Sequence, residues 1–287
     1  MLAQRLQASS VKKFIPPRKR DSRKGDNGKV AVIGGSYMYH GAPVLSSLAA
    51  LRSGTDLVYT CVPKVISESV RAISPNLIVI PMVDYKLTRG SANKLLGQLP
   101  PDLDSATIGM GLSIADEEGL KNIVTSLSSQ NVMLSLDASA LVKYILPSVS
   151  GKKVVLTPHA GEFKRMFGEM PPAATTPRVK MVEKAAKENS VVILLKGSTD
   201  VITDGQRTFL NPKNLASMTV GGTGDVLSGL VAGLLAKNHN LLESSAAASF
   251  VNGLAGKTSQ RKNGLHIVAT DLIDAIPAVM KLFDRVI

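Results

Sequence analysis

The sequence of 287 residues contains no tryptophan, one cysteine and only 4% aromatic residues. Because Cys61 is alone, it cannot form an intrachain disulfide, and its place in the apolar run 57–62 favours a core residue over a nucleophile. The four histidines are scattered and show no metal-ligand spacing. The sequence therefore predicts neither a disulfide scaffold nor a histidine metal site.

Long hydrophobic runs are also missing. The longest apolar stretch, residues 226–236, is interrupted by Ser228, Gly229 and Gly233, and residues 1–14 contain no continuous apolar segment. We therefore expect neither a membrane span nor a signal peptide, and we expect the protein in the cytoplasm.

Acidic residues are scarce at the N-terminus. Residues 1–29 hold nine lysines and arginines against Asp21 and Asp26, a local charge of +7, whereas residues 30–287 hold 25 basic and 20 acidic residues. A basic arm can bind nucleic acid or a membrane surface, but this one has Phe14 as its only aromatic residue and no nucleic-acid-reading motif. We expect an N-terminal extension, residues 1–28, that docks on its own fold or helps to bind an anionic ligand, without a specific nucleic-acid or membrane partner.

The remaining residues, 29–287, show the pattern of a single α/β domain. No linker divides them, and short β-branched runs alternate with segments of helical periodicity. The runs are too apolar for half-exposed strands, so we expect a mostly parallel central sheet with helices on both faces. The expected strands are 30–33, 57–62, 77–80, 107–108, 132–137, 154–156 and 191–195. The expected helices are 43–53, 116–127, 161–167, 177–188, 225–237, 243–257 and 270–286.

The most informative loop is the segment 219–225, which precedes an expected helix. Its three glycines, at 221, 222 and 224, let backbone amides converge at a helix N-terminus, which predicts an anion site suited to phosphate. A carboxylate is repelled by bound phosphate, so Asp225 fits better as the base that takes a proton from a hydroxyl attacking the γ-phosphoryl group. On this segment alone, an ordinary loop with a helix-capping aspartate is about equally consistent.

Two further loops follow expected strands. In residues 194–200, Lys196 could neutralise nucleotide phosphates and Gly197 could admit close backbone approach, although a hairpin turn into 201–203 explains this loop better when it is taken alone. In residues 156–163, Glu162 could hold a water on Mg²⁺ and His159 could reach a substrate phosphate. Such residues are more often a helix cap and a surface charge.

Six segments, taken in order, resemble the ATP/ADP-dependent NAD(P)H-hydrate dehydratases of the ribokinase-like superfamily. They are the arm segment 16–25, VIGGSYMYHGAP (32–43), SLDASAL (135–141), LTPHAGEF (156–163), LLKGSTDVI (194–202) and GGTGDVLSG (221–229). The resemblance implies a ribokinase-like fold and an enzyme that repairs hydrated NADH or NADPH (the S epimers of NADHX and NADPHX). In that reaction the stray hydroxyl is phosphorylated and phosphate then leaves. It also implies ATP or ADP as co-substrate, Mg²⁺, and assembly as a homotetramer.

The matching positions assign expected roles. Asp225 matches the catalytic base, and Glu162 remains the candidate for an indirect metal contact. The expected nucleotide-binding residues are Lys196, Gly197, Ser198, Thr199, Asp200, Gly222, Thr223 and Gly224. The expected substrate-binding residues are Tyr39, Ala42, Gly111, His159 and Asp225.

Some positions depart from the family pattern, and two other functions stay open. Met110 stands where the family usually has proline, Ser113 where it usually has a third glycine, and Asn252 where a histidine is usual. A small-molecule kinase of the same fold, acting on a vitamin-precursor alcohol, would stop at the phosphate ester. Tyr39 and the long arm favour the dehydratase. A basic nucleotide- or nucleic-acid-binding module without turnover is the third alternative.

Overall fold

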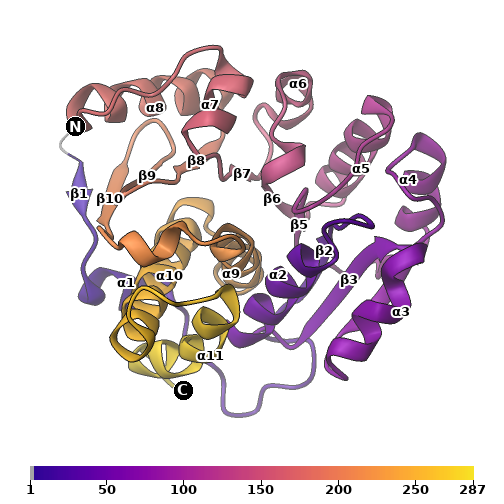
Figure 1. Ribbon diagram of the computed structural model, residues 1–287, viewed down its shortest axis with the longest axis horizontal. Coiled ribbons are helices and arrows are strands. Elements are labelled where there is room, and N and C mark those ends of the chain that lie inside the picture. Colours follow the sequence, from indigo (N-terminus) through magenta and orange to yellow (C-terminus); the bar gives the residue numbers. More distant parts are fainter. Residues whose placement is uncertain (1–2) are drawn as a thin grey trace.

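The computed structural model describes residues 3–287, which build one ten-stranded sheet with helices on both faces (Figure 1). The strands lie in the order β1-β10-β9-β8-β7-β6-β5-β2-β3-β4, and only β9 runs against the others in the described residues. The strands are β1 (Gln4–Arg5), β2 (Lys29–Ile33), β3 (Leu57–Pro63), β4 (Ile78–Met82), β5 (Ser105–Ile108), β6 (Met133–Leu136), β7 (Val154–Leu156), β8 (Val192–Leu195), β9 (Thr199–Thr203) and β10 (Thr208–Pro212). The predicted mostly parallel α/β fold is confirmed.

The helices form two layers. One face carries α4 (Arg89–Leu96), α5 (Glu117–Ser129), α6 (Leu146–Val149), α7 (Ala160–Phe167) and α8 (Thr175–Asn189). The other face carries α1 (Ala8–Phe14), α2 (Gly41–Arg52), α3 (Lys64–Ile73), α9 (Thr223–Asn238), α10 (Leu241–Asn263) and α11 (Ala269–Met280). Each face has its own core because successive strand residues point to opposite sides, as Ile193 and Leu194 do. Each helix in residues 3–287 is too short or too polar to cross a bilayer.

The structure differs from the predicted elements in several places. Strands β1 and β10 and helices α1, α3, α4 and α6 lie in segments for which no element was predicted. The predicted helix 270–286 ends as α11 at Met280, and a 3-10 turn, Lys281–Phe283, follows it. The tail is then extended because it pairs with the N-terminal arm: the N–H of Arg18 donates to Arg285 O at 2.8 Å, and the N–H of Ile287 donates to Arg18 O at 3.0 Å. Arg18 is distant from the tail in the sequence, so the hydrophobic periodicity of residues 270–286 does not indicate this pairing.

The N-terminal arm is packed on the rest of the chain. Strand β1 pairs with β10 at the end of the sheet, and α1 contacts α10. Val11 is fully buried in the core of that face, and the rings of Phe14 and Phe209 lie 5.5 Å apart. The basic charges of the arm are therefore held at fixed places on the surface of the domain.

Helix α9 crosses the centre of its layer in close contact with α2. A Cβ on Gly229 would lie 2.0 Å from the carbonyl oxygen of Ser46, so only glycine allows this approach. The hydroxyl of Ser46 donates to Asp225 O at 2.7 Å, and the hydroxyls of Ser228 and Thr107 lie 2.6 Å apart. The small residues that interrupt the apolar stretch 226–236 thus fix α9 against α2 and β5, and this contact fixes the position of Asp225.

Candidate active site

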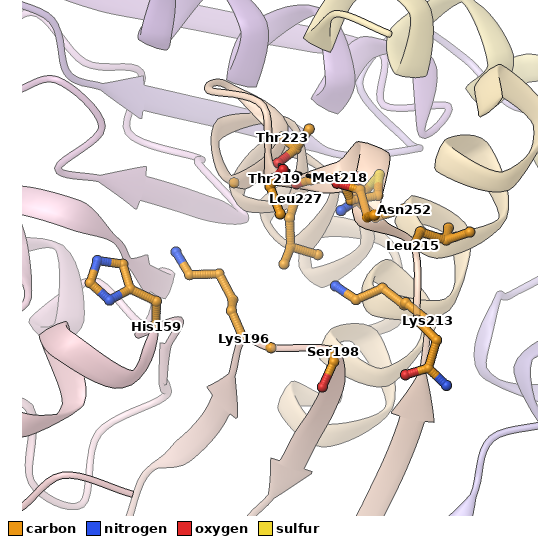
Figure 2. Close-up of a pocket in the computed structure, with 14 residues that line it drawn as sticks. His159, Lys196, Ser198, Lys213, Leu215, Met218, Thr219, Thr223, Leu227 and Asn252 are labelled. Carbon is orange, nitrogen blue, oxygen red and sulfur yellow. Dashed lines mark hydrogen bonds between the residues drawn. The ribbon is translucent and has the colours of Figure 1, made fainter. Parts of the chain in front are cut away.

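A cavity of about 590 Å³ lies where the carboxyl ends of the parallel strands meet the N-terminus of α9 (Figure 2). This is the edge at which open α/β sheets bind ligands. The lining residues are His159, Lys196, Gly197, Ser198, Lys213, Asn214, Leu215, Ala216, Met218, Thr219, Thr223, Gly224, Leu227 and Asn252.

Two loops expected to bind nucleotide face each other across this cavity. Lys196 and Gly197 follow β8, whereas Thr223 and Gly224 open α9, and all four residues line the cavity. A Cβ on Gly224 would lie 3.6 Å from Lys196 Nζ, so the ammonium group points at the start of the helix. The first turn of α9 has no side-chain cap, and its N–H groups lack intrahelical partners. The result is a positively polarised pocket floor suited to phosphate oxygens.

Asp225 lies in this first turn and is half-buried. Burial, followed by the nearby carboxylate of Asp137, raises the pKa of Asp225 to about 7, although Lys196 acts in the opposite direction. A carboxylate with this pKa exchanges protons near neutral pH, which suits a general base. Asp225 is not itself among the lining residues of the cavity, and its role as the base stays a prediction.

Lys196 is held by two carboxylates. Its Nζ lies 2.7 Å from Asp137 Oδ1 and 3.7 Å from Glu162 Oε2. Burial acts to lower the pKa of Lys196, but the charges of Asp137 and Glu162 outweigh it, so the pKa is raised and the side chain is cationic. Asp137 also accepts a hydrogen bond from the Thr157 hydroxyl at 2.9 Å. Sequence reasoning did not select Asp137, yet its place directly after β6 was a usable signal, because parallel strands end at one edge.

His159 and Glu162 form a capping box at the start of α7. His159 Nδ1 accepts the N–H groups of Gly161 at 3.0 Å and Glu162 at 3.2 Å, and Glu162 Oε2 accepts the N–H of His159 at 2.8 Å. The capping interpretation is correct for His159, whose ring also lines the cavity, with Nε2 3.5 Å from Glu162 Oε1. Because Nδ1 is an acceptor, the neutral ring carries its proton on Nε2 and can donate it to an anionic ligand.

The loop after β8 forms the hairpin turn between β8 and β9, and it also lines the cavity. The interpretation as a hairpin turn is therefore compatible with the interpretation as a nucleotide-binding loop. Asp200 is fully buried, and its carboxylate accepts the Gly197 N–H at 3.0 Å, the Ser249 hydroxyl at 2.6 Å and Lys213 Nζ at 2.8 Å. Asp200 therefore fixes the shape of the loop. Neither Asp200 nor Thr199, the first residue of β9, is among the lining residues.

Gly222 also acts through backbone shape. It is the N-cap of α9 with φ of 92°, and a Cβ there would lie 2.7 Å from Leu45 and 2.8 Å from Ala269. Of the expected nucleotide-binding residues, Lys196, Gly197, Ser198, Thr223 and Gly224 line the cavity itself.

Three of the five residues expected to bind substrate, Tyr39, Ala42 and Gly111, form a second group at the same edge, whereas His159 lines the nucleotide cavity and Asp225 lies in α9. Gly111 has φ of +64°, and a Cβ on it would lie 2.8 Å from Tyr39 Cβ and 3.2 Å from Ala42 Cβ. Tyr39 is 60% exposed. Tyr39 comes from the loop after β2, Gly111 from the loop after β5, and Ala42 from the first turn of α2, whose Ser46 is bonded to Asp225.

Sequence reasoning missed four polar residues of the cavity, which are Lys213, Asn214, Thr219 and Asn252. Lys213 follows β10, and Asn252 lies on α10 with 2% exposure. The Oδ1 atom of Asn252 is buried without a hydrogen-bond partner in the described part of the chain. Asn252 stands where the family usually has histidine, but nothing in the sequence of this chain indicates that α10 reaches the cavity.

The comparisons with known proteins agree with this geometry. The model of the NAD(P)H-hydrate dehydratase family matches residues 30–278. A protein of Cenarchaeum symbiosum (strain A) named ADP-dependent (S)-NAD(P)H-hydrate dehydratase is 60% identical over 285 residues, 99% of each chain. A protein of the same name from Nitrosopumilus maritimus (strain SCM1) is 61% identical over 286 residues, 100% of each chain.

Solved structures show the same relationship. The ADP/ATP-dependent NAD(P)H-hydrate dehydratase from Bacillus subtilis, co-crystallized with ATP/Mg²⁺, has a TM-score of 0.85 at 26% identity over 99% of this chain and 100% of that one. A ribokinase-like superfamily protein from Enterococcus faecalis V583 has a TM-score of 0.82 at 26% identity over 98% and 96%. The fold, the cavity and the matched segments lead to one assignment: this chain belongs to the NAD(P)H-hydrate dehydratase family, with its ribokinase-like fold.

Proposed function

We propose that this chain repairs hydrated NADH and NADPH, the S epimers of NADHX and NADPHX, by nucleotide-dependent dehydration. The observation that carries the proposal is Asp225, a carboxylate with a pKa of about 7 beside Lys196 and the start of α9. ADP is the expected co-substrate because the relatives with 60% and 61% identity are named ADP-dependent, and their names also favour the dehydratase over the kinase. Assembly as a homotetramer and a cytoplasmic location are proposed from the family resemblance.

The cavity residues and the neighbouring Asp225 divide the work of phosphoryl transfer. The nucleotide phosphates lie on the N–H groups of Thr223 and Gly224, and Lys196 neutralises their charge. Asp225 accepts the proton of the substrate hydroxyl while its oxygen forms a bond to phosphorus and the nucleotide P–O bond breaks. AMP leaves when ADP is the donor.

The second half of the reaction restores the ring. Hydroxide is a poor leaving group, whereas phosphate is a good one. The C–O bond therefore breaks with its electron pair going to phosphate, the ring nitrogen lone pair assists, and the adjacent carbon loses a proton. The sum is loss of water from the hydrate and hydrolysis of one nucleotide phosphate.

The residues present fit a Mg²⁺ ion held mainly through water. Asp137 and Glu162 each have oxygens near Lys196, and Mg²⁺ is commonly bound by one or two carboxylates, waters and substrate phosphates. In the described residues no group of three or more acidic, His or Cys side chains forms a direct metal cage. When bound, Mg²⁺ would neutralise charge on the phosphate oxygens. Glu162 and Asp137 would hold its waters.

The test is to incubate the purified chain with (S)-NADHX, Mg²⁺ and ADP or ATP. We expect the absorbance of reduced nicotinamide to return together with one inorganic phosphate per turnover, and Asp225→Asn to lose most of this activity. Accumulation of a stable phosphate ester without reduced nicotinamide would identify a kinase instead. Absence of turnover with both nucleotides would reject the proposal.

A further inference from the structure

A second cavity, of about 240 Å³, lies at the opposite end of α9 and is lined by positive charges from four separate segments. Arg18 comes from the N-terminal arm, Arg52 from the last turn of α2 and Lys237 from the last turn of α9, whereas Lys281 and Arg285 follow α11. Asp225 and Lys237 are twelve residues apart on α9, about 18 Å along the helix axis. This basic cavity is therefore separate from the nucleotide cavity.

Most of these charges have no carboxylate partner. Arg18 pairs with Asp56 at 2.5 Å, but in residues 3–287 no ion pair involves Arg52, Lys237, Lys281 or Arg285. Asp284 is the one carboxylate that lines the cavity. Together, Asp284 and Asp56 offset two of the five positive charges, so three remain in a small space.

Two of the cations are partly withdrawn from water. Burial, followed by the charge of Arg18, lowers the pKa of Lys237, against the opposing effect of Asp284 and Asp56. The Nε atom of Arg285 is buried without a hydrogen-bond partner among the described residues. Like charges held together with incomplete hydration cost free energy, and a bound anion would remove that cost.

Stabilisation of helix C-termini explains only part of this arrangement. Lys237 Nζ donates to Ser53 O at 3.1 Å, at the end of α2, as the helix dipole favours. No hydrogen bond ties the side chains of Arg52 or Lys281 to a helix end in the described part of the chain. The arm is fixed beside the cavity by backbone bonds, including Arg20 N–H to Ile287 O at 2.8 Å. The C-terminal ends of α2, α9 and α11 meet the N-terminal arm at this one cavity. A ligand site requires such a convergence of charged groups.

We propose that this basic cavity binds a small anion with two linked phosphate groups, as in inorganic pyrophosphate or the diphosphate of a nucleotide. Three uncompensated positive charges match a multiply charged anion. Apolar walls from Ile15, Pro277 and Phe283 enclose it, and such a concave site suits a small molecule. A nucleic-acid backbone would instead need a row of exposed cations.

The experiment titrates inorganic pyrophosphate into the full chain by calorimetry and into crystals by soaking. The double variant Arg52→Gln/Lys281→Gln removes two exposed cations of the cavity, and Lys12→Gln/Lys13→Gln removes two exposed cations of α1 as a charge-matched control. We expect the first variant to weaken pyrophosphate binding at least 10-fold and the control to change it less than threefold. Both should keep the wild-type dehydratase kcat, and neither should lower the Tm.

Density for pyrophosphate beside Arg52, Lys237 and Lys281 would support the proposal. Equal weakening in both variants, or pyrophosphate bound only at the start of α9, would overturn it. A DNA duplex that binds more tightly than pyrophosphate at the same salt, and loses affinity in the Arg52→Gln/Lys281→Gln variant, would also overturn it and identify a nucleic-acid surface. Because neither variant touches the nucleotide cavity, failure here leaves the proposed function intact.

Discussion

At the scale of single residues, the site depends on how the surroundings treat Asp225 and Lys196. Both side chains are shielded from water. The carboxylates of Asp137 and Glu162 raise the pKa of each, which favours the charged form of Lys196 and the neutral form of Asp225. Asp137 and Glu162 keep Lys196 charged, and the same charges hinder ionisation of Asp225. In the proposed reaction, Lys196 would serve as the cation that binds phosphate and Asp225 as the base that takes a proton near neutral pH.

The first prediction concerns the base itself. Asp225→Asn keeps the size of the side chain and removes its basicity, so we expect kcat to fall roughly 10²–10⁴-fold. The variant should bind ADP at least as tightly as wild type, since one negative charge near the phosphates is gone. Steady-state kinetics and calorimetry measure the two quantities. Turnover close to that of wild type would show that another group accepts the proton.

The second prediction follows from the raised pKa of Asp225. The base must be ionised, so kcat/KM should fall with acid below about pH 7, and this acid limb should be absent from the residual activity of Asp225→Asn. Ionisation in the fold is costly, and this cost is small near pH 4, builds up as the pH rises towards 7 and is complete above it. Asp225→Asn should therefore be more stable than wild type above pH 7, by about 2 kcal/mol after allowing for solvent screening. Denaturant unfolding at pH 5 and pH 8 tests the sign, and a larger gain at pH 5 would contradict it.

At the scale of elements, the strands were largely predictable because a parallel sheet buried on both faces needs continuous β-branched runs. The short helices α3 and α4 escaped prediction, although the buried Ile66 and Val70 have helical spacing. The hairpin after β8, the start of α7 and the start of α9 were identified as functional loops because each follows a strand or opens a helix. The ion pair of Lys196 and Asp137 joins residues 59 positions apart, and only the fold reveals such a pairing.

The third prediction tests the hairpin after β8. A side chain at Gly197 would meet the flexible end of Arg178, 2.7 Å from its Nη2, so Gly197→Val should fold cooperatively. The added bulk would stand in the nucleotide cavity, and we expect the KM for ADP to rise at least 10-fold. Unchanged ADP affinity in a folded variant would mean that the loop is only a turn.

The fourth prediction tests the crossing of α2 and α9. Gly229→Ala places a methyl group 2.0 Å from a backbone oxygen, so the helices must separate, and we expect a loss of about 2–4 kcal/mol in the free energy of unfolding. Gly90→Ala is the matched control, because this glycine of α4 has no neighbour closer than Thr88 Oγ1 at 3.8 Å. It should be neutral or slightly stabilising. Similar losses in both variants would show that helix propensity, and not the crossing, sets the effect.

At the scale of the whole molecule, α9 connects two cavities that lie at its opposite ends. Its first turn lies at the carboxyl edge of the sheet and faces the nucleotide cavity, whereas its last turn contributes to the basic cavity beside the N-terminal arm. The sequence predicted the first region, since its glycines and aspartate are adjacent in the chain. It could not predict the second, whose five cations come from segments that only folding brings together.

The most direct test of the account follows one oxygen atom. In the proposed reaction the substrate hydroxyl becomes part of the phosphate that leaves, so (S)-NADHX labelled with ¹⁸O in that hydroxyl should yield inorganic phosphate containing one ¹⁸O per NADH formed. Mass spectrometry of phosphate from a reaction with ADP and Mg²⁺ measures the label. Quantitative transfer of ¹⁸O to phosphate is the predicted result. Recovery of the label in water, with unlabelled phosphate, would contradict phosphorylation of the substrate and with it the role of Asp225.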